Sequence, residues 1–458
     1  MIFTQYYLDC LSQASYLIGD ETTGRAVVVD PRRDVDEYVT DADAAGLTIE
    51  RVIETHVHAD FVSGHLELAE QTGASISYGE RATVDFEIEP LADGERLSLG
   101  DVELEILATP GHTPESISVV VREHPGDDPF GVLTGDTLFI GDVGRPDLLA
   151  AVGITPEDMA RQLYRSLHDR LLALPDATRV FPAHGAGSAC GKHLSSETQS
   201  TIGEQRRANY ALTPMTEDDF VDIVTEGQPL APGYFSYDAQ RNREARPLLE
   251  EHEPPSLLSI GEVLALVEAG AIVIDTREPH EFAHGHLRDS VNIWLASRFA
   301  EFTGDIVDPD RRIVLVCDQG AELEARVRLA RIGFDHVVGA LAAPDAVFAE
   351  RPELVDQLSR LSIRQFDARR ADTPGLVLLD VRNPGEQTEG MIPGALPTPL
   401  PMLPDAMSRL DPHAPTVVYC ASGARSAIAA SALRARGFED VSDLLGGYEA
   451  YVREKEAA

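Results

Sequence analysis

Two histidines and one aspartate occupy five positions of this chain, His56, His58 and Asp60, shortly after the apolar pair Val52-Ile53. Imidazole nitrogens and carboxylate oxygens are ligands that transition metals bind in proteins. A loop at the end of a rigid strand is a place where such ligands can converge. This spacing therefore predicts a metal site at the end of a strand.

Three later segments supply further ligands of the same kind. Each places one imidazole or carboxylate after a β-rich run, and the residues are His112, Asp136 and His184. Any one of these histidines alone could be an ordinary surface or core imidazole. Four such segments together are much harder to obtain by chance, so we expect them to form one metal centre.

These segments resemble the signature of the metallo-β-lactamase superfamily, His-x-His-x-Asp-His followed by a distant His, Asp and His. The chain departs from it at Phe61, where the two-metal hydrolases of the superfamily carry a histidine for their second metal. A phenyl ring cannot ligate a metal, so we expect one metal per chain. His56, His112 and Asp136 then complete a set of two histidines and one carboxylate. This set suits non-haem Fe(II), with open positions for oxygen and substrate.

The single-metal interpretation leaves His58, Asp60 and His184 without a metal. We predict that they orient the ligand imidazoles and bound water through hydrogen bonds. The alternative, in which His58 or His184 contacts the metal directly, stays open.

The composition narrows the class of protein. A length of 458 residues suggests about three domains. The formal net charge is -39, and Lys192 and Lys455 are the only lysines. Such an acidic surface is typical of a high-salt cytoplasm, where salt screens the repulsion between carboxylates. It also argues against nucleic acid as a partner, because it would repel phosphates.

Four widely spaced cysteines form no C-x-x-C pair, and they are Cys10, Cys190, Cys317 and Cys420. We expect free, intracellular thiols. The N-terminus lacks a basic region followed by an apolar core, and no apolar run reaches the length of a membrane span. We therefore expect a cytoplasmic protein without a membrane partner. The sequence leaves its oligomeric state open, a homo-oligomer included.

The first half of the chain alternates short β-rich runs with helical patterns. The runs are 26–30, 52–55 and 104–107, and the helical patterns are 34–45, 64–71 and 195–212. This alternation predicts an αββα sandwich. The proline- and glutamate-rich segment 247–255 is the expected linker.

An internal repeat follows the linker. The strand pattern 272–277 returns at 377–382, and the pattern 313–317 returns at 416–420, each copy ending in a cysteine followed by a helical stretch. Strands separated by helical segments predict a mainly parallel sheet with helices on both faces. We therefore expect three domains, at residues 1–246, 257–350 and 360–458.

The two copies resemble rhodanese domains, through the pattern Asp-x-Arg-x-x-x-Glu-Phe-x-x-Gly-His that begins at Asp275 and through the loop from Cys420 to Ser426. Between a strand and a helix, such a loop can point backbone N–H groups at the sulfur and stabilise a thiolate or persulfide. We expect Cys420 to be catalytic and Arg425 to close the loop and pair with an anion such as sulfite. The six residues from Cys420 to Arg425 suit sulfur transfer, because phosphatases of this kind use a longer loop.

The first copy lacks these features. Asp318 follows its cysteine, and Glu322 stands where Arg425 stands in the second copy. Carboxylates beside the sulfur raise a thiol pKa and repel sulfite. We therefore expect a non-catalytic scaffold, with sulfur transfer by Cys317 as the alternative.

The order of the three domains resembles the persulfide dioxygenase-rhodanese fusions. The resemblance implies that Fe(II), one per chain, oxidises a low-molecular-weight persulfide to sulfite with dioxygen, and that the rhodanese domain turns sulfite into thiosulfate. Arg145 is then the candidate for binding the anionic part of the thiol carrier, or else a structural ion-pair residue. Cys190 is either close to the metal or a packed small hydrophobe. Two rival functions are a zinc-dependent thioester hydrolase of the glyoxalase II kind and non-catalytic sulfur-carrier docking by the tandem domains.

Overall fold

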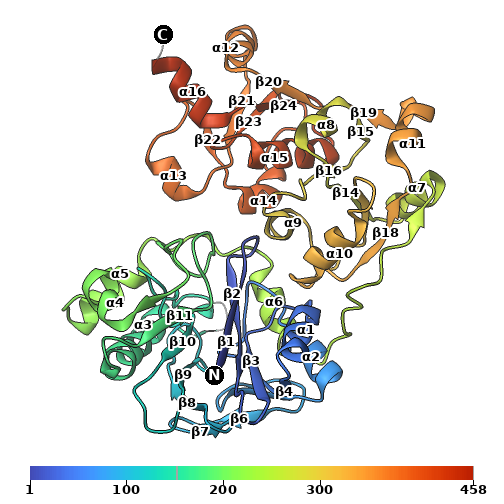
Figure 1. The fold of residues 1–458 in the computed structure, drawn as a ribbon. Coiled ribbons are helices and arrows are strands. Elements are labelled where there is room, and N and C mark those ends of the chain that lie inside the picture. The colour runs from blue at the N-terminus through green and yellow to red at the C-terminus, as the bar shows by residue number, and fades with distance from the viewer. Residues whose placement is uncertain (151–152, 457–458) are drawn as a thin grey trace. The chain divides into compact units, whose positions relative to one another are not determined.

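The fold is described from a computed structural model, which covers residues 1–150 and 153–456. The chain divides into two compact units. The first comprises residues 1–231 and 235–250, and the second comprises residues 232–234 and the chain from 251 onward. Figure 1 shows the elements of both units along the chain.

Two six-stranded sheets form the centre of the first unit. The first sheet contains, in spatial order, β1 (Ile2–Leu8), β2 (Gln13–Gly19), β3 (Arg25–Val29), β4 (Thr48–Ile53), β5 (Ser75–Gly79) and β6 (Glu89–Leu91). The second contains β12 (Ser200–Thr201), β11 (Arg179–Pro182), β10 (Gly131–Gly135), β9 (Ile117–Arg122), β8 (Glu103–Ala108) and β7 (Arg96–Ser98). In the first sheet β1 to β3 pair antiparallel, whereas β3 to β6 pair parallel.

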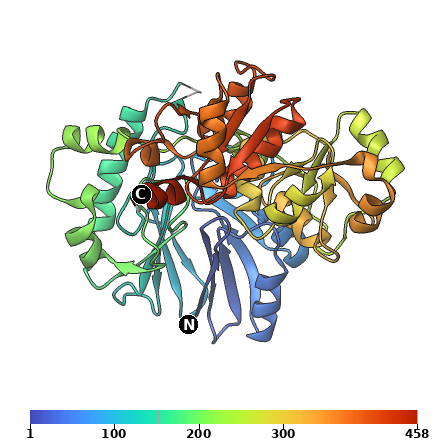
Figure 2. The same cartoon turned by 90° about the horizontal axis from the view of Figure 1, so that it is seen from above.

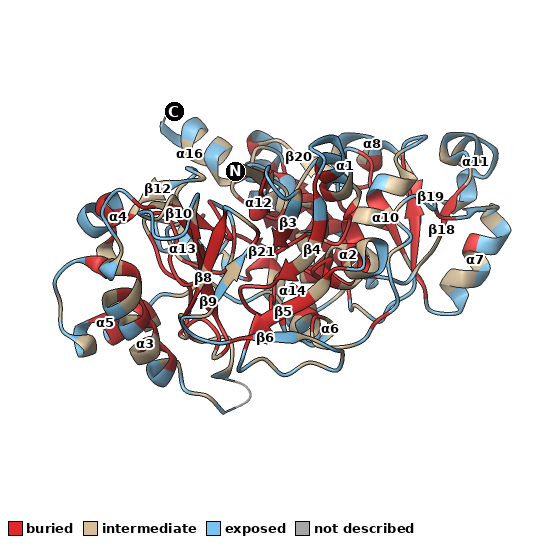
Figure 3. Ribbon diagram, turned by 60° about the horizontal axis from the view of Figure 1, so that its bottom comes forward, coloured by how far each residue is buried: buried red, intermediate tan, exposed pale blue. Residues whose placement is uncertain are grey.

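The strands are apolar on both faces, because each sheet is covered twice. In β3, Val27 and Val29 belong to the core between the sheets, whereas Ala26 and Val28 belong to the core under the helices. The helices α1 (Asp36–Ala44) and α2 (His65–Thr72) cover the first sheet, and α3 (Pro156–Arg165) and α5 (Glu217–Thr225) cover the second. Figure 3 shows the buried strands between these layers. The predicted αββα sandwich is confirmed.

One predicted helix is much shorter than expected. Of the segment 195–212, only α4 (Ile202–Ala208) is α-helical, and it is preceded by β12 and followed by a 3-10 turn, Tyr210–Leu212. Thr201 caps the helix by accepting a hydrogen bond from the Glu204 N–H, and Asn209 ends it with extended backbone angles. Polar side chains that bind nearby backbone groups compete with helix continuation, which explains the early end.

The second unit contains two five-stranded sheets of the same strand order. The first consists of β13 (Leu257–Leu258), β18 (Val337–Leu341), β17 (Ile313–Val316), β14 (Ile272–Asp275) and β16 (Val291–Asn292). The second consists of β20 (Ser359–Leu361), β24 (Val441–Leu444), β23 (Thr416–Tyr419), β21 (Val377–Asp380) and β22 (Leu396–Pro397). All pairings in both sheets are parallel. The predicted repeat of a parallel α/β domain is confirmed.

Helices lie between successive strands of both sheets along the chain (Figure 2). The first copy carries α7 (Ile260–Glu268), α8 (Pro279–His284), α9 (Phe299–Ile306), α10 (Glu322–Ala330) and α11 (Pro344–Glu350). The second copy carries α12 (Ile363–Asp372), α13 (Pro384–Thr388), α14 (Leu403–Met407), α15 (Ala424–Ala435) and α16 (Gly447–Glu456). None of the helices in the described ranges combines the length and the apolar character that crossing a bilayer requires.

The two copies pack against each other through α15. The Asn292 N–H of the first copy donates to Ser431 Oγ of α15 at 3.0 Å, and Arg434 pairs with Asp356 at 2.6 Å. Residues 426–433 of α15 are all buried. The first copy therefore covers the helix that begins at the Cys420 loop.

Candidate metal centre and cysteine loop

The predicted metal ligands lie on loops that follow β4, β8 and β10. The structure brings ligand atoms of His56, His112 and Asp136 within 4.8 Å of one another, and all three residues are buried. Asp136 Oδ2 lies 3.8 Å from His56 Nε2 and 3.5 Å from His112 Nε2. Metal–ligand bonds of about 2.1 Å place neighbouring ligand atoms roughly 3.0 to 3.6 Å apart, so the spacing is close to that of a metal centre.

Hydrogen bonds fix which nitrogen of each ligand histidine is available. His112 Nδ1 donates to the carbonyl oxygen of Arg145 at 2.9 Å, since a carbonyl can only accept. The Thr55 hydroxyl donates to the Asp30 carboxylate at 2.8 Å and therefore accepts from His56 Nδ1 at 2.9 Å. Both histidines thus keep the Nε2 lone pair for the side of the carboxylate.

The charges of the three groups suit a divalent cation. Burial holds the pKa of both His56 and His112 below the usual value, so both are neutral at neutral pH. Burial raises the pKa of Asp136, but His184 and the other imidazoles outweigh it and hold that pKa well below its usual range. Among the described residues, His56 Nε2 and Asp136 Oδ2 are buried without a hydrogen-bond partner. Such atoms are costly unless something binds them, and a metal ion fits.

His184, on the loop after β11, contacts the Asp136 carboxylate at Oδ1, the oxygen that does not face His56 and His112. Its Nδ1 lies 2.7 Å from Asp136 Oδ1, and its Nε2 lies 2.7 Å from Asp60 Oδ2. The two carboxylates outweigh burial and raise the pKa of His184 well above its usual value. These are the contacts that an orienting role requires. Cys190 joins Asp60 and His184 in a second buried group of candidate ligands within 4.8 Å.

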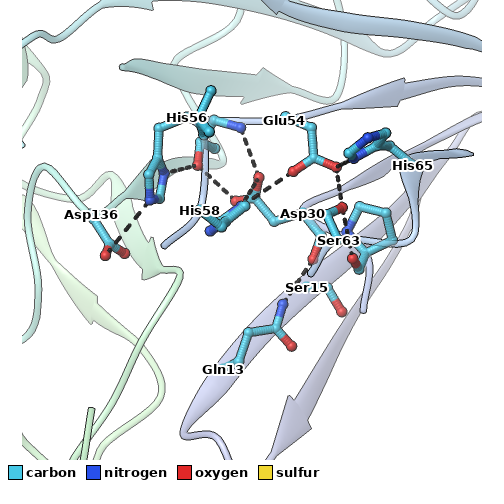
Figure 4. A network of polar contacts seen from close by, with 12 residues as sticks. Gln13, Ser15, Asp30, Glu54, His56, His58, Ser63, His65 and Asp136 are labelled. Atoms are coloured by element: carbon cyan, nitrogen blue, oxygen red, sulfur yellow. Dashed lines mark hydrogen bonds and ion pairs between the residues drawn. The ribbon is translucent and has the colours of Figure 1, made fainter. Parts of the chain in front are cut away.

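His58 points to a different set of carboxylates, as Figure 4 shows. Its Nε2 lies 3.1 Å from Asp30 Oδ1 and 3.2 Å from Glu54 Oε2. Although burial opposes it, these carboxylates raise the pKa of His58 to about 10. On the other side of Glu54, His65 Nδ1 lies 3.3 Å from Oε1. The Phe61 ring packs on the imidazole of His58, with 4.4 Å between the ring centroids.

The sequence interpretation missed Asp30 and Glu54, which are both fully buried. The available signal was the one used for the metal ligands. Asp30 directly follows the apolar run of β3, and Glu54 directly follows β4. A carboxylate at such a position seldom stays buried without a partner.

The loop around Gly144 and Arg145 packs against the metal ligands Asp136 and His112. A Cβ atom at Gly144 would lie 1.9 Å from the Asp136 carbonyl oxygen, so only glycine fits. The Arg145 side chain is buried and donates to both carboxylate oxygens of Asp147, at 2.7 and 2.9 Å, and to the Ala189 carbonyl at 2.9 Å. These contacts favour a structural role for Arg145 over the expected contact with the thiol carrier.

Cys420 follows β23 and precedes α15, between strand and helix as the sequence predicts. The Gly423 N–H donates to Cys420 Sγ at 3.1 Å. From outside the loop, the N-terminus of α16 donates to the loop carbonyls, Tyr448 N to Cys420 O at 2.7 Å and Glu449 N to Ala421 O at 3.1 Å. These carbonyls thus point outward to α16, while the Gly423 N–H faces the sulfur.

Arg425 is already paired in the structure. Its two terminal nitrogens donate to both carboxylate oxygens of Glu386 on α13, at 2.7 and 2.8 Å. A bidentate pair of this kind has well-defined geometry. Arg425 therefore locks the loop to α13, whereas the sequence suggested that it would be available to an incoming anion.

Besides Asp318 and Gln319 in the loop itself, the first copy differs from the second at Glu322, Ala343 and Pro344. Glu322 accepts from the Gly320 N–H of its own loop at 2.9 Å, in place of an arginine. Ala343, with φ 46°, takes the place of the left-handed Gly446, and Pro344 takes the place of Gly447 at the start of the following helix. Burial, together with the nearby carboxylates, raises the pKa of Cys317 to about 12.

Comparisons with known proteins agree with both halves of this description. A sequence model of the metallo-β-lactamase superfamily matches residues 8–184, and a model of the rhodanese-like domain matches residues 259–342 and 362–454. The crystal structure of a metallo-β-lactamase from Staphylococcus aureus is 33% identical, with a TM-score of 0.67, and the match covers 74% of this chain and 98% of that one.

Among the curated relatives are two that match slightly less than half of the chain. Human mitochondrial persulfide dioxygenase ETHE1 is 31% identical over 216 residues, which are 46% of this chain and 75% of that protein. A β-lactamase hydrolase-like protein from Agrobacterium fabrum is 34% identical over 240 residues, which are 45% of this chain and 52% of that protein. The chain thus spans about half the length of the first of its curated relatives. It belongs to the metallo-β-lactamase superfamily, with a persulfide dioxygenase-like domain followed by two rhodanese-like domains.

Proposed function

We propose that the first unit oxidises a low-molecular-weight thiol persulfide, RSSH, with dioxygen and water to the thiol, sulfite and two protons. His56, His112 and Asp136 would hold one Fe(II). The observation that carries this proposal is the buried group of two Nε2 atoms and one carboxylate oxygen that face one another. Fe(II) held by such a set supplies open positions at which dioxygen and a sulfur donor bind.

The surrounding residues prepare the ligands for this chemistry. The Thr55 hydroxyl and the Arg145 carbonyl keep His56 and His112 in the tautomer that offers Nε2. His184 binds Oδ1 of Asp136, so that Oδ2 is left for the metal. Burial of all three ligands excludes bulk water, which protects a reactive sulfur species from side reactions.

We propose that the second unit consumes the sulfite. The Cys420 thiolate attacks the outer sulfur of a second persulfide, which forms a cysteine persulfide and releases the thiol. Sulfite then attacks the outer sulfur of this cysteine persulfide. The new S–S bond makes thiosulfate, and the electron pair of the broken bond returns to Cys420 as the thiolate. The Gly423 N–H, 3.1 Å from the sulfur, would stabilise both anionic forms.

The test combines metal analysis with product analysis. Protein purified without oxygen should contain one iron per chain and should consume dioxygen when supplied with glutathione persulfide or another small persulfide, with thiosulfate as the product. Absence of oxygen uptake from the iron-loaded protein on every persulfide of such a panel would refute the proposal.

One observation favours a second candidate, a zinc-dependent thioester hydrolase. The group of Asp60, His184 and Cys190 could hold a second metal, although Phe61 occupies the position of the usual histidine ligand. Two bound metals, together with thioester hydrolysis and no oxygen uptake, would favour this candidate. For either function we propose that the protein works in a cytoplasm of high salt concentration, because its formal net charge is -39.

A further inference from the structure

The loop that carries His56, His58 and Asp60 has little regular structure of its own. Most of its backbone groups cannot pair within a helix or strand, so they need partners from elsewhere. One partner comes from the far end of the first unit, beyond the part that matches the superfamily model. It is Asn242, which directly follows α6 (Phe235–Arg241).

Asn242 uses its whole side-chain amide on this loop. Its Nδ2 donates to the carbonyl oxygen of His58 at 2.9 Å and to that of Phe61 at 2.7 Å. Its Oδ1 accepts from the Ser63 N–H at 2.8 Å. The residue is fully buried, so water does not compete for these bonds. The three contacts fix the turn from His58 to Ser63 at both ends.

A second anchor holds the same segment in place. Arg246 donates to both carboxylate oxygens of Glu67 on α2, at 2.5 and 2.9 Å, and also to the Ser63 carbonyl oxygen. Glu67 further accepts from Arg33 at 3.1 Å and from the Leu249 N–H at 3.1 Å. Part of the expected linker is therefore bound to the first unit. Arg246 lies four residues after Asn242, so its buried ion pair with Glu67 also holds the backbone next to Asn242 in place.

We infer that Asn242 is a positioning residue of the metal centre. By holding the carbonyls of His58 and Phe61, it sets where the preceding ligand His56 stands relative to His112 and Asp136. Residues that orient metal ligands through hydrogen bonds typically affect metal affinity by 10- to 100-fold. This inference rests on the metal site of the proposed function.

The test measures metal binding rather than activity. Co(II) is added to metal-free wild-type protein, Asn242→Ala and Asn242→Ser, and its dissociation constant is obtained by competition with a chelator. The inference expects about 10- to 100-fold weaker binding for Asn242→Ala and a changed ligand-field spectrum, because the ligand geometry relaxes. The serine keeps one donor and should lie between the two. It also serves as the deciding variant if the alanine variant does not fold.

Asn292 provides a matched control in the second unit. It is likewise buried, and its Nδ2 donates to two carbonyls, those of Asp275 at 3.0 Å and Arg277 at 2.9 Å. Asn292→Ala should lower thermal stability and leave the Co(II) dissociation constant unchanged. Equal affinities and spectra for wild type and Asn242→Ala, or an equal loss in Asn292→Ala, would overturn the inference. Failure of the wild type to bind Co(II) would instead overturn the proposed metal site and this inference with it.

Discussion

Substitution of Gly447 by alanine should inactivate the Cys420 loop without touching the cysteine. Gly447 begins α16 with φ 55°, and a Cβ atom there would lie 2.2 Å from the Cys420 carbonyl oxygen and 2.5 Å from that of Ala421. Left-handed backbone costs an alanine roughly 1 to 2 kcal/mol. The contact must also open by about 1 Å, and displacements of that size at a reacting group can cost roughly 100-fold in rate.

The assay separates the loop from the rest of the protein. The rate of Cys420 alkylation by iodoacetamide at pH 7, followed by mass spectrometry, should fall by at least about tenfold, since one lost charge-assisted hydrogen bond is worth about 1.5 to 3 kcal/mol. Thiosulfate formation from persulfide and sulfite should fall with it. Oxygen uptake should stay at the wild-type rate.

Gly375→Ala is the matched control for backbone strain. Gly375 also lies in the second copy with φ 80°, but a Cβ atom there meets nothing within 4 Å. This variant should lose a similar amount of stability from the backbone and keep the alkylation rate. Unchanged alkylation in Gly447→Ala, or an equal loss in Gly375→Ala, would refute the argument that the α16 contact shapes the loop.

The remaining predictions concern both units. Cys420→Ser should stop thiosulfate formation while oxygen uptake continues and sulfite accumulates, whereas Cys317→Ser should change neither; extra sulfur found by mass spectrometry on Cys317 instead would reverse the assignment. His112→Ala should lose most bound iron and all oxygen uptake, because two remaining ligands hold a divalent ion poorly; full iron content with activity would show that the ligand set is wrong. Two buried arginines outweigh burial and lower the pKa of Glu67 to about 2 from the usual 4.5, so the stabilisation is complete above pH 4.5 and is lost as pH falls through 2. The unfolding temperature of the first unit should therefore fall as the pH is lowered from 4.5 toward 2, and Glu67→Gln should make this fall smaller. An unfolding temperature with the same pH dependence in wild type and Glu67→Gln would contradict the prediction. Finally, Glu322→Arg combined with Ala343→Gly and Pro344→Gly should raise the alkylation rate of Cys317.

Much of the candidate metal site could be predicted because its ligands follow strands. His112 and Asp136 each stand shortly after an apolar β run, and the ends of neighbouring strands meet at one edge of a sheet. The type of these residues and their position after a strand are enough to predict metal ligands, even when no contact is known. The same holds for Cys420, whose loop lies between β23 and α15 as expected.

Other parts of the site carried no such signal. Asn242 is an ordinary residue in an irregular stretch, and only the folded chain shows that it binds the His58–Ser63 turn. Arg425 was identified, but its partner was not, because Glu386 lies on another helix. Contacts between residues far apart in the sequence depend on tertiary packing, which local sequence patterns do not encode.

The two rhodanese-like copies show why the last prediction needs three changes. In the second copy, Arg425 binds Glu386, and the corresponding acid of the first copy is Glu281. The first copy therefore has two acids where an ion pair is needed, and Glu322 bonds to its own loop instead. Arginine at this position could pair with Glu281 and release that loop.

An arginine alone would leave the other side of the loop unsupported. The N–H groups of α16 that bind the carbonyls of the Cys420 loop belong to Tyr448 and Glu449, which directly follow Gly446 and Gly447. The first copy has Ala343 and Pro344 in place of these two glycines. Glycine at both positions removes the left-handed alanine and restores a backbone N–H that proline lacks. The burial that raises the pKa of Cys317 would remain, so alkylation should rise without reaching the rate of Cys420. No gain in the triple variant, measured beside the single Glu322→Arg variant, would show that the lost ion pair and the helix contact do not account for the difference between the two cysteines.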